Sequence, residues 1–149
     1  MALPSWITDH VKLYQTDPEK AHYWDSTIGG GKGMIPTLLL TTKGRKSGRD
    51  IPIPLIYGKH GPAYVVIASK GGSPEHPDWY KNLVANPVCQ IQIVRQRYRA
   101  RARTAKGDER TKLWAQLRDI YPPYDEYQRN TKGREIPVVV LDPIEPIET

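Results

Sequence analysis

A basic turn punctuated by glycine and serine is the first part of this chain whose residues could do chemistry. Its cations fall within one short stretch: Lys43, Arg45, Lys46 and Arg49. Glycines between them let the backbone turn sharply, and backbone N–H groups beside lysine and arginine form a concavity that suits anions. We expect Lys46 and Ser47 to hold a phosphate, with Arg45 or Arg49 adding charge. A hairpin turn with solubilising charges is the open alternative.

Two further groups suit a flat ligand. Residues 68–72, Ala-Ser-Lys-Gly-Gly, end a predicted strand, and the paired glycines would let a ring lie close to the backbone. Trp79 and Asn82 lie three residues apart, on one face of a predicted helix. The alternatives are that Ser69 satisfies a local backbone group and that Trp79 is a core anchor.

Three tyrosines form the next candidate group: Tyr121, Tyr124 and Tyr127. Tyr124 and Tyr127 are three apart, so on a helix they share a face, while the two prolines before Tyr124 start that helix afresh. A phenol with a pKa near 10 donates hydrogen bonds first and protons only with assistance. An aromatic patch that packs the last helix onto the sheet is the alternative.

An arginine stripe, defined as Arg95, Arg97, Arg99, Arg101 and Arg103, occupies every second position of a predicted strand. An extended strand places alternate residues on one face, which would suit nucleic acid or another anion. However, Tyr98 points the other way, so no base-stacking aromatic interleaves the stripe. Charged side chains also protect strand edges, so a solvated face remains open.

Metal and nucleophile chemistry have little support in the sequence. The histidines, at positions 10, 22, 60 and 76, form no metal-binding spacing, and we expect no metal site. No Gly-x-Ser-x-Gly motif is present. The single cysteine, Cys89, falls in a predicted strand, where a small core residue is expected.

Composition limits the remaining choices. A chain of 149 residues with 38% hydrophobic content suits one compact domain. No stretch of 18 apolar residues is present and the N-terminus lacks a signal-peptide pattern, so with one cysteine we expect a cytoplasmic protein. A net charge of +6 favours anionic partners without choosing among them.

The elements that must position these groups follow from periodicity. Residues 5–16 have the apolar spacing of an amphipathic helix, and the glycine-rich residues 28–33 predict a flexible linker. Six strands are predicted at 37–43, 51–57, 63–69, 88–94, 96–104 and 136–141, and three helices at 77–85, 108–120 and 123–130. Short turns without βαβ alternation indicate an antiparallel barrel, followed by an extended C-terminal tail.

Five segments stand in a characteristic order: Thr-Thr-x-Gly-Arg-Lys-Ser-Gly, Ala-Ser-Lys-Gly-Gly, Trp-Tyr-x-Asn-Leu-x-Ala-Asn-Pro, Tyr-Pro-x-Tyr-x-x-Tyr and Ile-Pro-Val-Val. Over about residues 36–143 the chain thereby resembles the deazaflavin-dependent nitroreductase family of actinobacteria. The resemblance implies a mainly β fold, a split β-barrel of the FMN-binding type with peripheral helices. It divides the chain into an N-terminal helix and linker (1–33), an F420-binding barrel (34–144) and a tail (145–149).

Site residues follow from the same resemblance. Members bind coenzyme F420, with its anionic, phosphate-bearing tail at the basic turn and its flat ring beside residues 68–72. The implied cofactor-binding residues are Arg45, Lys46, Ser47, Pro54, Leu55, Ala68, Ser69, Lys70, Gly71, Gly72, Trp79 and Asn82. The implied catalytic residues are Tyr124, Ser69, Tyr127 and Tyr121, at a mouth where substrate enters. FMN is the competing cofactor, and only the resemblance favours F420.

The implied activity is hydride transfer from reduced F420 to a small electron-poor substrate, namely a quinone, an activated alkene or a nitroaromatic. The proton would come from Tyr124 or from water. A non-catalytic flavin or F420 binder is the first alternative, and a nucleic-acid binder using the arginine stripe is the second. The N-terminal helix suggests a peripheral membrane contact, and the oligomeric state stays open.

Overall fold

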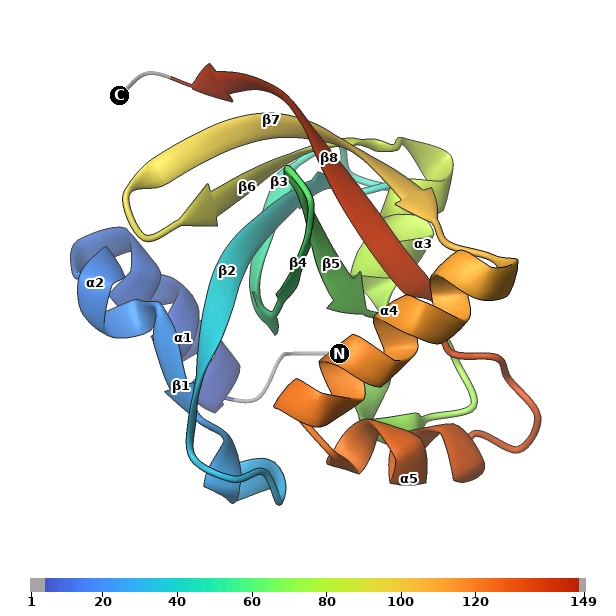
Figure 1. Cartoon of the computed structure of the whole chain (residues 1–149). Helices are drawn as coiled ribbons and strands as arrows, with labels where there is room; N and C mark the ends of the chain where they lie inside the picture. Colours follow the sequence, from blue (N-terminus) through green and yellow to red (C-terminus); the bar gives the residue numbers. More distant parts are fainter. Residues whose placement is uncertain (1–4, 148–149) are drawn as a thin grey trace.

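The computed structural model describes residues 5–147 as one strongly curled, eight-stranded antiparallel sheet with helices around it (Figure 1). Residues 1–4 of the predicted N-terminal segment and residues 148–149 of the predicted tail lie outside the described residues. The strands are β1 (Tyr23–Asp25), β2 (Met34–Lys43), β3 (Asp50–Ile56), β4 (Gly58–His60), β5 (Ala63–Ile67), β6 (Val88–Ile93), β7 (Gln96–Thr104) and β8 (Val138–Ile147). The helices are α1 (Ser5–Thr16), α2 (Pro18–Ala21), η1 (Ser26–Gly29), η2 (Lys70–Gly72), α3 (Asp78–Ala85), α4 (Gly107–Ile120) and α5 (Pro123–Arg129).

Strand order explains the curled shape. The strands run β1-β2-β6-β7-β8-β5-β4, and β3 pairs with β2 away from this path. In Figure 1, α1 and α2 lie beside β1 and β2, whereas α4 and α5 pack against one face of β5 and β8 and α3 packs against the opposite face. The predicted mainly β, split-barrel fold with peripheral helices is therefore confirmed.

Strand β5 and the first four residues of β8 are largely buried on both faces. Val65 and Val140 are register partners in one apolar cluster, which α4 and α5 cover. Val66 and Val139 are partners in a second cluster, which holds Trp79 of α3. Successive residues of a strand point to opposite faces, so these continuous valine-rich runs fill both clusters at once.

The strand count differs from the prediction because two strands are very short. β1 and β4 have three residues each, too few to show a period in the sequence. β8 also continues to Ile147, beyond the predicted end at 141, so the start of the predicted tail is in fact a paired strand. A register shift between Arg99 and Ala100 of β7 accommodates this extension, which contains two prolines.

Helix α1 matches its prediction and packs against the sheet through Tyr14. This side chain is fully buried, its hydroxyl donates to the Thr37 carbonyl at 2.7 Å, and it accepts the Val94 N–H at 3.3 Å. Burial raises the pKa of Tyr14 to about 12, so the phenol stays neutral. None of the helices described within residues 5–147 is long and apolar enough to cross a membrane.

The glycine-rich segment predicted as a flexible linker is closed by hydrogen bonds. The buried Ser26 hydroxyl donates to the Gly33 carbonyl at 2.5 Å, and the Gly31 N–H donates to the Ser26 carbonyl at 2.8 Å. A Cβ at Gly31 would lie 2.3 Å from the Ser26 hydroxyl oxygen, so the close approach requires glycine there. The segment is a tight loop that leads directly into β2.

Candidate functional site

Helix α3 holds the basic turn in place. The Asn82 amide oxygen accepts the Arg45 backbone N–H at 3.2 Å and the Arg45 guanidinium at 2.9 Å. The Asn82 amide nitrogen donates to the Thr42 hydroxyl at 3.1 Å, and Arg45 also pairs with Asp78 at 3.3 Å. Asn82 is almost completely buried, and the hydrogen bonds of its amide group hold the turn against α3.

The tip of the turn keeps its donors free. Among residues 5–147, Lys46 and Arg49 have no carboxylate within ion-pair distance, whereas Lys43 pairs with Asp50 at 2.5 Å. Within the same residues, the backbone N–H groups of Lys46 and Ser47 have no acceptor. Free N–H groups beside an uncompensated lysine are what an anion needs, so the tip fits a phosphate.

Three apolar side chains, called the floor below, pack together near the basic turn and the loop after β5 (residues 68–73): Leu55, Ala68 and Trp79. Leu55 of β3 packs against the cluster that contains Ala68 and Trp79, both of which are buried. Pro54 is the register partner of Leu39, whereas Leu55 pairs with Leu38, so the two predicted β3 residues face opposite sides of the strand. Trp79 is 5% exposed and belongs to a core cluster, so it is a core anchor, which was the alternative expectation.

The loop after β5 has an unusual backbone. Lys70, Gly71 and Gly72 all have positive φ, at 46°, 62° and 86°. A Cβ at Gly72 would lie 2.8 Å from the Tyr127 carbonyl oxygen and 3.0 Å from its Cα, so only glycine lets this loop pack against α5. At Gly71 a Cβ would meet open space. The loop thus has an inner residue that touches α5 and an outer residue that is accessible.

Arg134 is a site residue that the sequence analysis missed. Its guanidinium donates to three carbonyls of this loop, those of Ala68 at 3.0 Å, Ser69 at 2.7 Å and Ser73 at 2.9 Å. A fourth contact, at 3.1 Å, joins it to Nδ1 of His76. The partners lie up to 66 residues earlier in the chain, so no local pattern could have revealed them.

The predicted tyrosines form a compact cluster at the same end of the sheet. Tyr121 and Tyr124 have ring centroids 5.0 Å apart, and the Tyr121 and Tyr127 hydroxyls lie 2.9 Å apart. The Tyr121 hydroxyl also donates to the Gly29 carbonyl at 3.0 Å. Tyr121 and Tyr124 are only 3% and 4% exposed, whereas Tyr127 is partly exposed.

Burial controls the acidity of these phenols. It raises the pKa of both Tyr121 and Tyr124 far above the ordinary phenol value. Both side chains are therefore neutral at any physiological pH. They can act as packing groups or hydrogen-bond donors and are poor proton donors.

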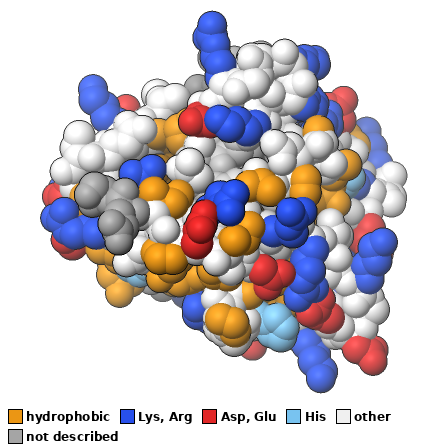
Figure 2. Space-filling view, turned by 90° about the horizontal axis from the view of Figure 1, so that it is seen from above, with side chains coloured by type: hydrophobic (Ala, Val, Ile, Leu, Met, Phe, Trp, Pro, Cys, Tyr) orange, Lys and Arg blue, Asp and Glu red, His pale blue; other side chains and the backbone are white. Residues whose placement is uncertain are grey.

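The arginine stripe lies away from these groups and is largely ion-paired. Arg99 pairs with Glu145 at 2.9 Å, and Arg103 pairs with Glu109 at 2.6 Å and Asp142 at 3.1 Å. Arg95, which lies in the turn before β7, pairs with Glu19. Figure 2 shows acidic and basic side chains interspersed on the face seen from above, as the solvated-face alternative predicts.

The structure thus brings most of the predicted residues together through direct contacts. Asn82 joins the turn to α3, Trp79 joins α3 to Ala68, and Gly72 joins the loop to Tyr127 of α5. Free donors at the tip of the turn and an exposed Gly71 in the loop after β5 are features that suit a flat cofactor with an anionic tail. Within residues 5–147, no three His, Cys, Asp or Glu side chains form a group that could hold a metal ion.

Comparisons with known proteins agree with this arrangement. Residues 12–143 match the family model described as F420H(2)-dependent quinone reductase. The chain is 38% identical to F420H(2)-dependent quinone reductase Rv1261c of Mycobacterium tuberculosis, over 95% of this chain and 98% of that protein. An F420-H2 dependent reductase named FDR-A is a structural neighbour with a TM-score of 0.66 and 41% identity, over 72% of this chain and 94% of that chain.

A second solved structure, a domain-swapped dimer, has a TM-score of 0.69 and 35% identity, over 93% of this chain and 98% of that chain. The matched region contains the basic turn, the glycine loop, α3 and the tyrosine cluster. The predicted recognition is therefore confirmed, and reduced coenzyme F420 is the cofactor that goes with it. The chain belongs to the F420H(2)-dependent quinone reductase family of oxidoreductases.

Proposed function

We propose that this protein reduces a quinone to the hydroquinone with hydride from reduced F420, at the site between the basic turn and the tyrosine cluster. Bound reduced F420 supplies the hydride, and a proton from solvent or a side chain completes the reduction. The observation that carries the proposal is that α3 joins a turn with free donors to an accessible glycine loop. Activated alkenes and nitroaromatics are the further substrates to be tested.

The basic turn is proposed to bind the anionic part of the cofactor. Lys46 and the N–H groups of Lys46 and Ser47 are uncommitted among the described residues, so they supply the contacts to phosphate. Arg45 is already bonded to Asn82 and Asp78, so its charge supports the turn from behind. These contacts are remote from the reacting ring and should contribute to binding rather than to the chemical step.

The ring is proposed to lie against the floor and the loop. Leu55, which is partly exposed, provides apolar surface in front of the buried Ala68 and Trp79, and Gly71 allows close approach because nothing lies within 4 Å of a Cβ placed there. Pro54 lies on the opposite face of β3 from Leu55, on the side of its register partner Leu39, so it would contact the ring through its backbone alone. Ser69 is half-buried at the head of the loop, where its hydroxyl can hydrogen-bond a ligand.

Tyr127 is proposed to contact the substrate. Its ring is partly exposed, while Tyr121 and Tyr124 lie behind it in the core. Because Tyr121 donates to Gly29, the Tyr127 hydroxyl is positioned as a donor that can turn to a substrate oxygen as that oxygen gains negative charge. Tyr124 would then act by packing against both rings rather than by donating the proton.

Exposed apolar side chains near the N-terminus are proposed to contact membranes peripherally, where lipophilic quinones reside, from the cytoplasmic side. Trp6, Tyr23 and Met34 are 52%, 54% and 62% exposed, and Trp6 stacks on Trp24 with ring centroids 5.8 Å apart. In this view residues 1–33 bear the contact together with Met34 at the boundary, and residues 34–144 form the cofactor-binding unit. Co-sedimentation with liposomes, with and without anionic lipid, tests it, and failure to bind either kind would remove the hypothesis.

The first experiment is a fluorescence titration of the purified protein with F420 and, separately, with FMN. Binding of F420 alone is expected. Anaerobic oxidation of reduced F420 is then followed by absorbance with a menaquinone analogue, an enone and a nitroaromatic. Turnover of the quinone supports the proposal, binding without turnover of any acceptor supports a non-catalytic carrier, and binding of neither cofactor contradicts it.

A further inference from the structure

We propose that Arg134 is a positioning residue that holds the loop of residues 68–73 in the shape needed for cofactor binding and hydride transfer. The inference rests on the proposed function, which places the ring of F420 against this loop. Arg134 itself lies between α5 and β8, outside every motif that identifies the site. Its contacts with the loop are all to backbone carbonyls and not to loop side chains.

The geometry of the contacts requires a guanidinium. Three donor nitrogens of one planar group reach three carbonyls and one imidazole nitrogen, with separations between 2.7 and 3.1 Å. A lysine has a single nitrogen at this place and cannot span carbonyls of residues 68, 69 and 73 together. Charge-assisted hydrogen bonds of this kind are about twice as strong as neutral ones.

The loop needs such external support. Lys70 adopts a φ of 46°, which is unfavourable for a residue with a side chain, and it is followed by two glycines at positive φ. Glycines leave the unbound loop many alternative conformations. A conformation of this kind persists only where the surroundings over-determine it, and the carbonyls bound by Arg134 flank the strained residues on both sides.

The charge of Arg134 is uncompensated within the described part of the chain. No carboxylate lies within 4.0 Å of it, although the neighbouring Arg110 has Glu135 at 3.5 Å. Arg134 is half-buried, so solvent screens its charge incompletely, and this burial lowers its pKa relative to a free arginine. A partly buried cation beneath the loop would attract an anionic cofactor, which gives a reason to keep it unpaired.

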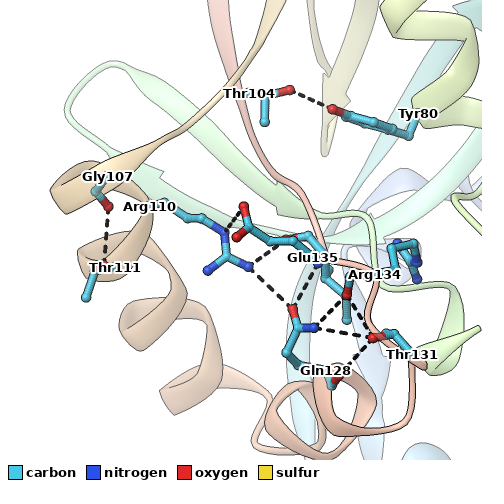
Figure 3. Close-up of polar contacts among 10 residues, drawn as sticks. Tyr80, Thr104, Gly107, Arg110, Thr111, Gln128, Thr131, Arg134 and Glu135 are labelled. Carbon is cyan, nitrogen blue, oxygen red and sulfur yellow. Dashed lines mark hydrogen bonds and ion pairs between the residues drawn. The ribbon is translucent and has the colours of Figure 1, made fainter. Parts of the chain in front are cut away.

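A separate network fixes the backbone from which Arg134 projects. The Arg134 carbonyl accepts from the Gln128 amide at 2.7 Å and from the Thr131 hydroxyl at 2.8 Å. Figure 3 shows Gln128 between Thr131 and Arg110, with Arg110 reaching the Ile136 carbonyl at 2.8 Å. Arg110 therefore stabilises residues 128–136, as Arg134 does, without touching the loop of residues 68–73. This makes it a matched control.

The test compares Arg134→Lys with Arg110→Lys. For each variant, the F420 dissociation constant is measured by fluorescence titration, kcat and KM for the quinone are measured at saturating reduced F420, and the apo-protein is unfolded in urea. Arg134→Lys is expected to weaken F420 binding by about tenfold or more and to lower kcat. Arg110→Lys should change both by clearly less than Arg134→Lys does, even where it lowers stability as much, because the guanidinium contacts of Arg134 to the loop stay in place.

Equal F420 affinity and equal kcat in the two variants would overturn the inference. If Arg134→Lys does not fold, His76→Leu removes only one of the four contacts and replaces it in the comparison. A loss of affinity of about twofold or more in that variant supports the inference, and wild-type affinity overturns it. Failure of the wild-type protein to bind F420 would instead contradict the proposed function, so the two failures are distinguishable.

Discussion

Lys46 is the residue on which the proposed phosphate site depends most directly. It is exposed at the tip of the turn and has no carboxylate partner among the described residues, so replacing it should perturb little else. We expect Lys46→Ala to weaken F420 binding by roughly five- to fiftyfold, as loss of one charge-assisted contact does, with little change in kcat at saturating cofactor. Fluorescence titration and steady-state kinetics measure the two quantities.

The control for this prediction is Lys112→Ala. Lys112 is exposed on α4. Its replacement removes the same charge from a surface that lacks the free N–H groups of the turn. Equal losses of affinity in the two variants would mean that only the net charge matters. An unchanged affinity in Lys46→Ala would move the phosphate away from the turn.

His76 should make stability depend on pH. Burial, then the nearby Arg134 and Lys81 charges, lower the pKa of His76 below 6.5. The Arg134 contact at Nδ1 also requires the neutral ring, because a guanidinium can only donate. The unfolded chain therefore takes up a proton more readily, so this contribution to stability is present above pH 6.5 and is lost as pH falls through the folded pKa.

We accordingly expect the free energy of unfolding to fall between pH 7 and pH 5, measured by urea unfolding at several pH values. Glu19 and Glu109 do not explain this window, because hydrogen bonds from arginines lower the pKa of both carboxyl groups. His76→Asn keeps an acceptor for Arg134 but does not titrate, so it should flatten the dependence. The same slope in this variant would assign the effect to another group, such as His22, whose pKa burial also lowers.

At the scale of elements, the packing of the glycine loop against α5 decides whether the cofactor site and the tyrosine cluster form one unit. Gly72 and Gly71 both have positive φ, but only Gly72 faces backbone, that of Tyr127. Alanine at either position should cost about 1–2 kcal/mol from the left-handed conformation. Gly72→Ala should cost roughly a further 1–3 kcal/mol because α5 must shift.

Urea unfolding of the Gly71→Ala and Gly72→Ala variants measures this difference directly, with Gly71→Ala as the matched control for the backbone term. The two variants are also expected to differ in the position of Tyr127, because only a Cβ at Gly72 would push against its backbone. Equal stability would show that α5 is not held by the loop, and the two halves of the site would then be independent.

At the scale of the whole molecule, the distribution of charge argues against nucleic acid as a partner. Three arginines of the stripe are paired with carboxylates, and Arg97 is hydrogen-bonded to Gln90 at 3.2 Å. On the face shown in Figure 2, basic side chains are interspersed with acidic ones rather than collected in one patch. Non-specific binding requires several uncompensated cations along one track.

We expect no saturable binding of a single-stranded oligonucleotide at about 0.15 M salt, measured by fluorescence anisotropy. The variant Glu145→Gln, which frees Arg99, tests whether the assay responds to an unpaired stripe. Tight binding by the wild-type protein with a steep dependence on salt would contradict this prediction and restore the nucleic-acid alternative.

Local patterns in the sequence were sufficient to predict most of the elements and the residues of the turn and loop. Strand and helix periods depend on burial of one face, and glycines report positive φ or close approach, so both leave traces in neighbouring residues. These local patterns did not predict β1 and β4, which are too short to show a period. They also did not predict the end of β8, where pairing with β7 overrides the two prolines.

The sequence by itself determined the mainly β fold, the basic turn at Lys46 and the glycine loop, because each is encoded by residues close together in the chain. Only the tertiary structure decided that Tyr124 is buried, that Asn82 fixes the turn and that Arg134 supports the loop. These facts depend on contacts between segments far apart in the sequence. Such contacts form only when the sheet curls and brings α3, α5 and the loop after β5 to the same end.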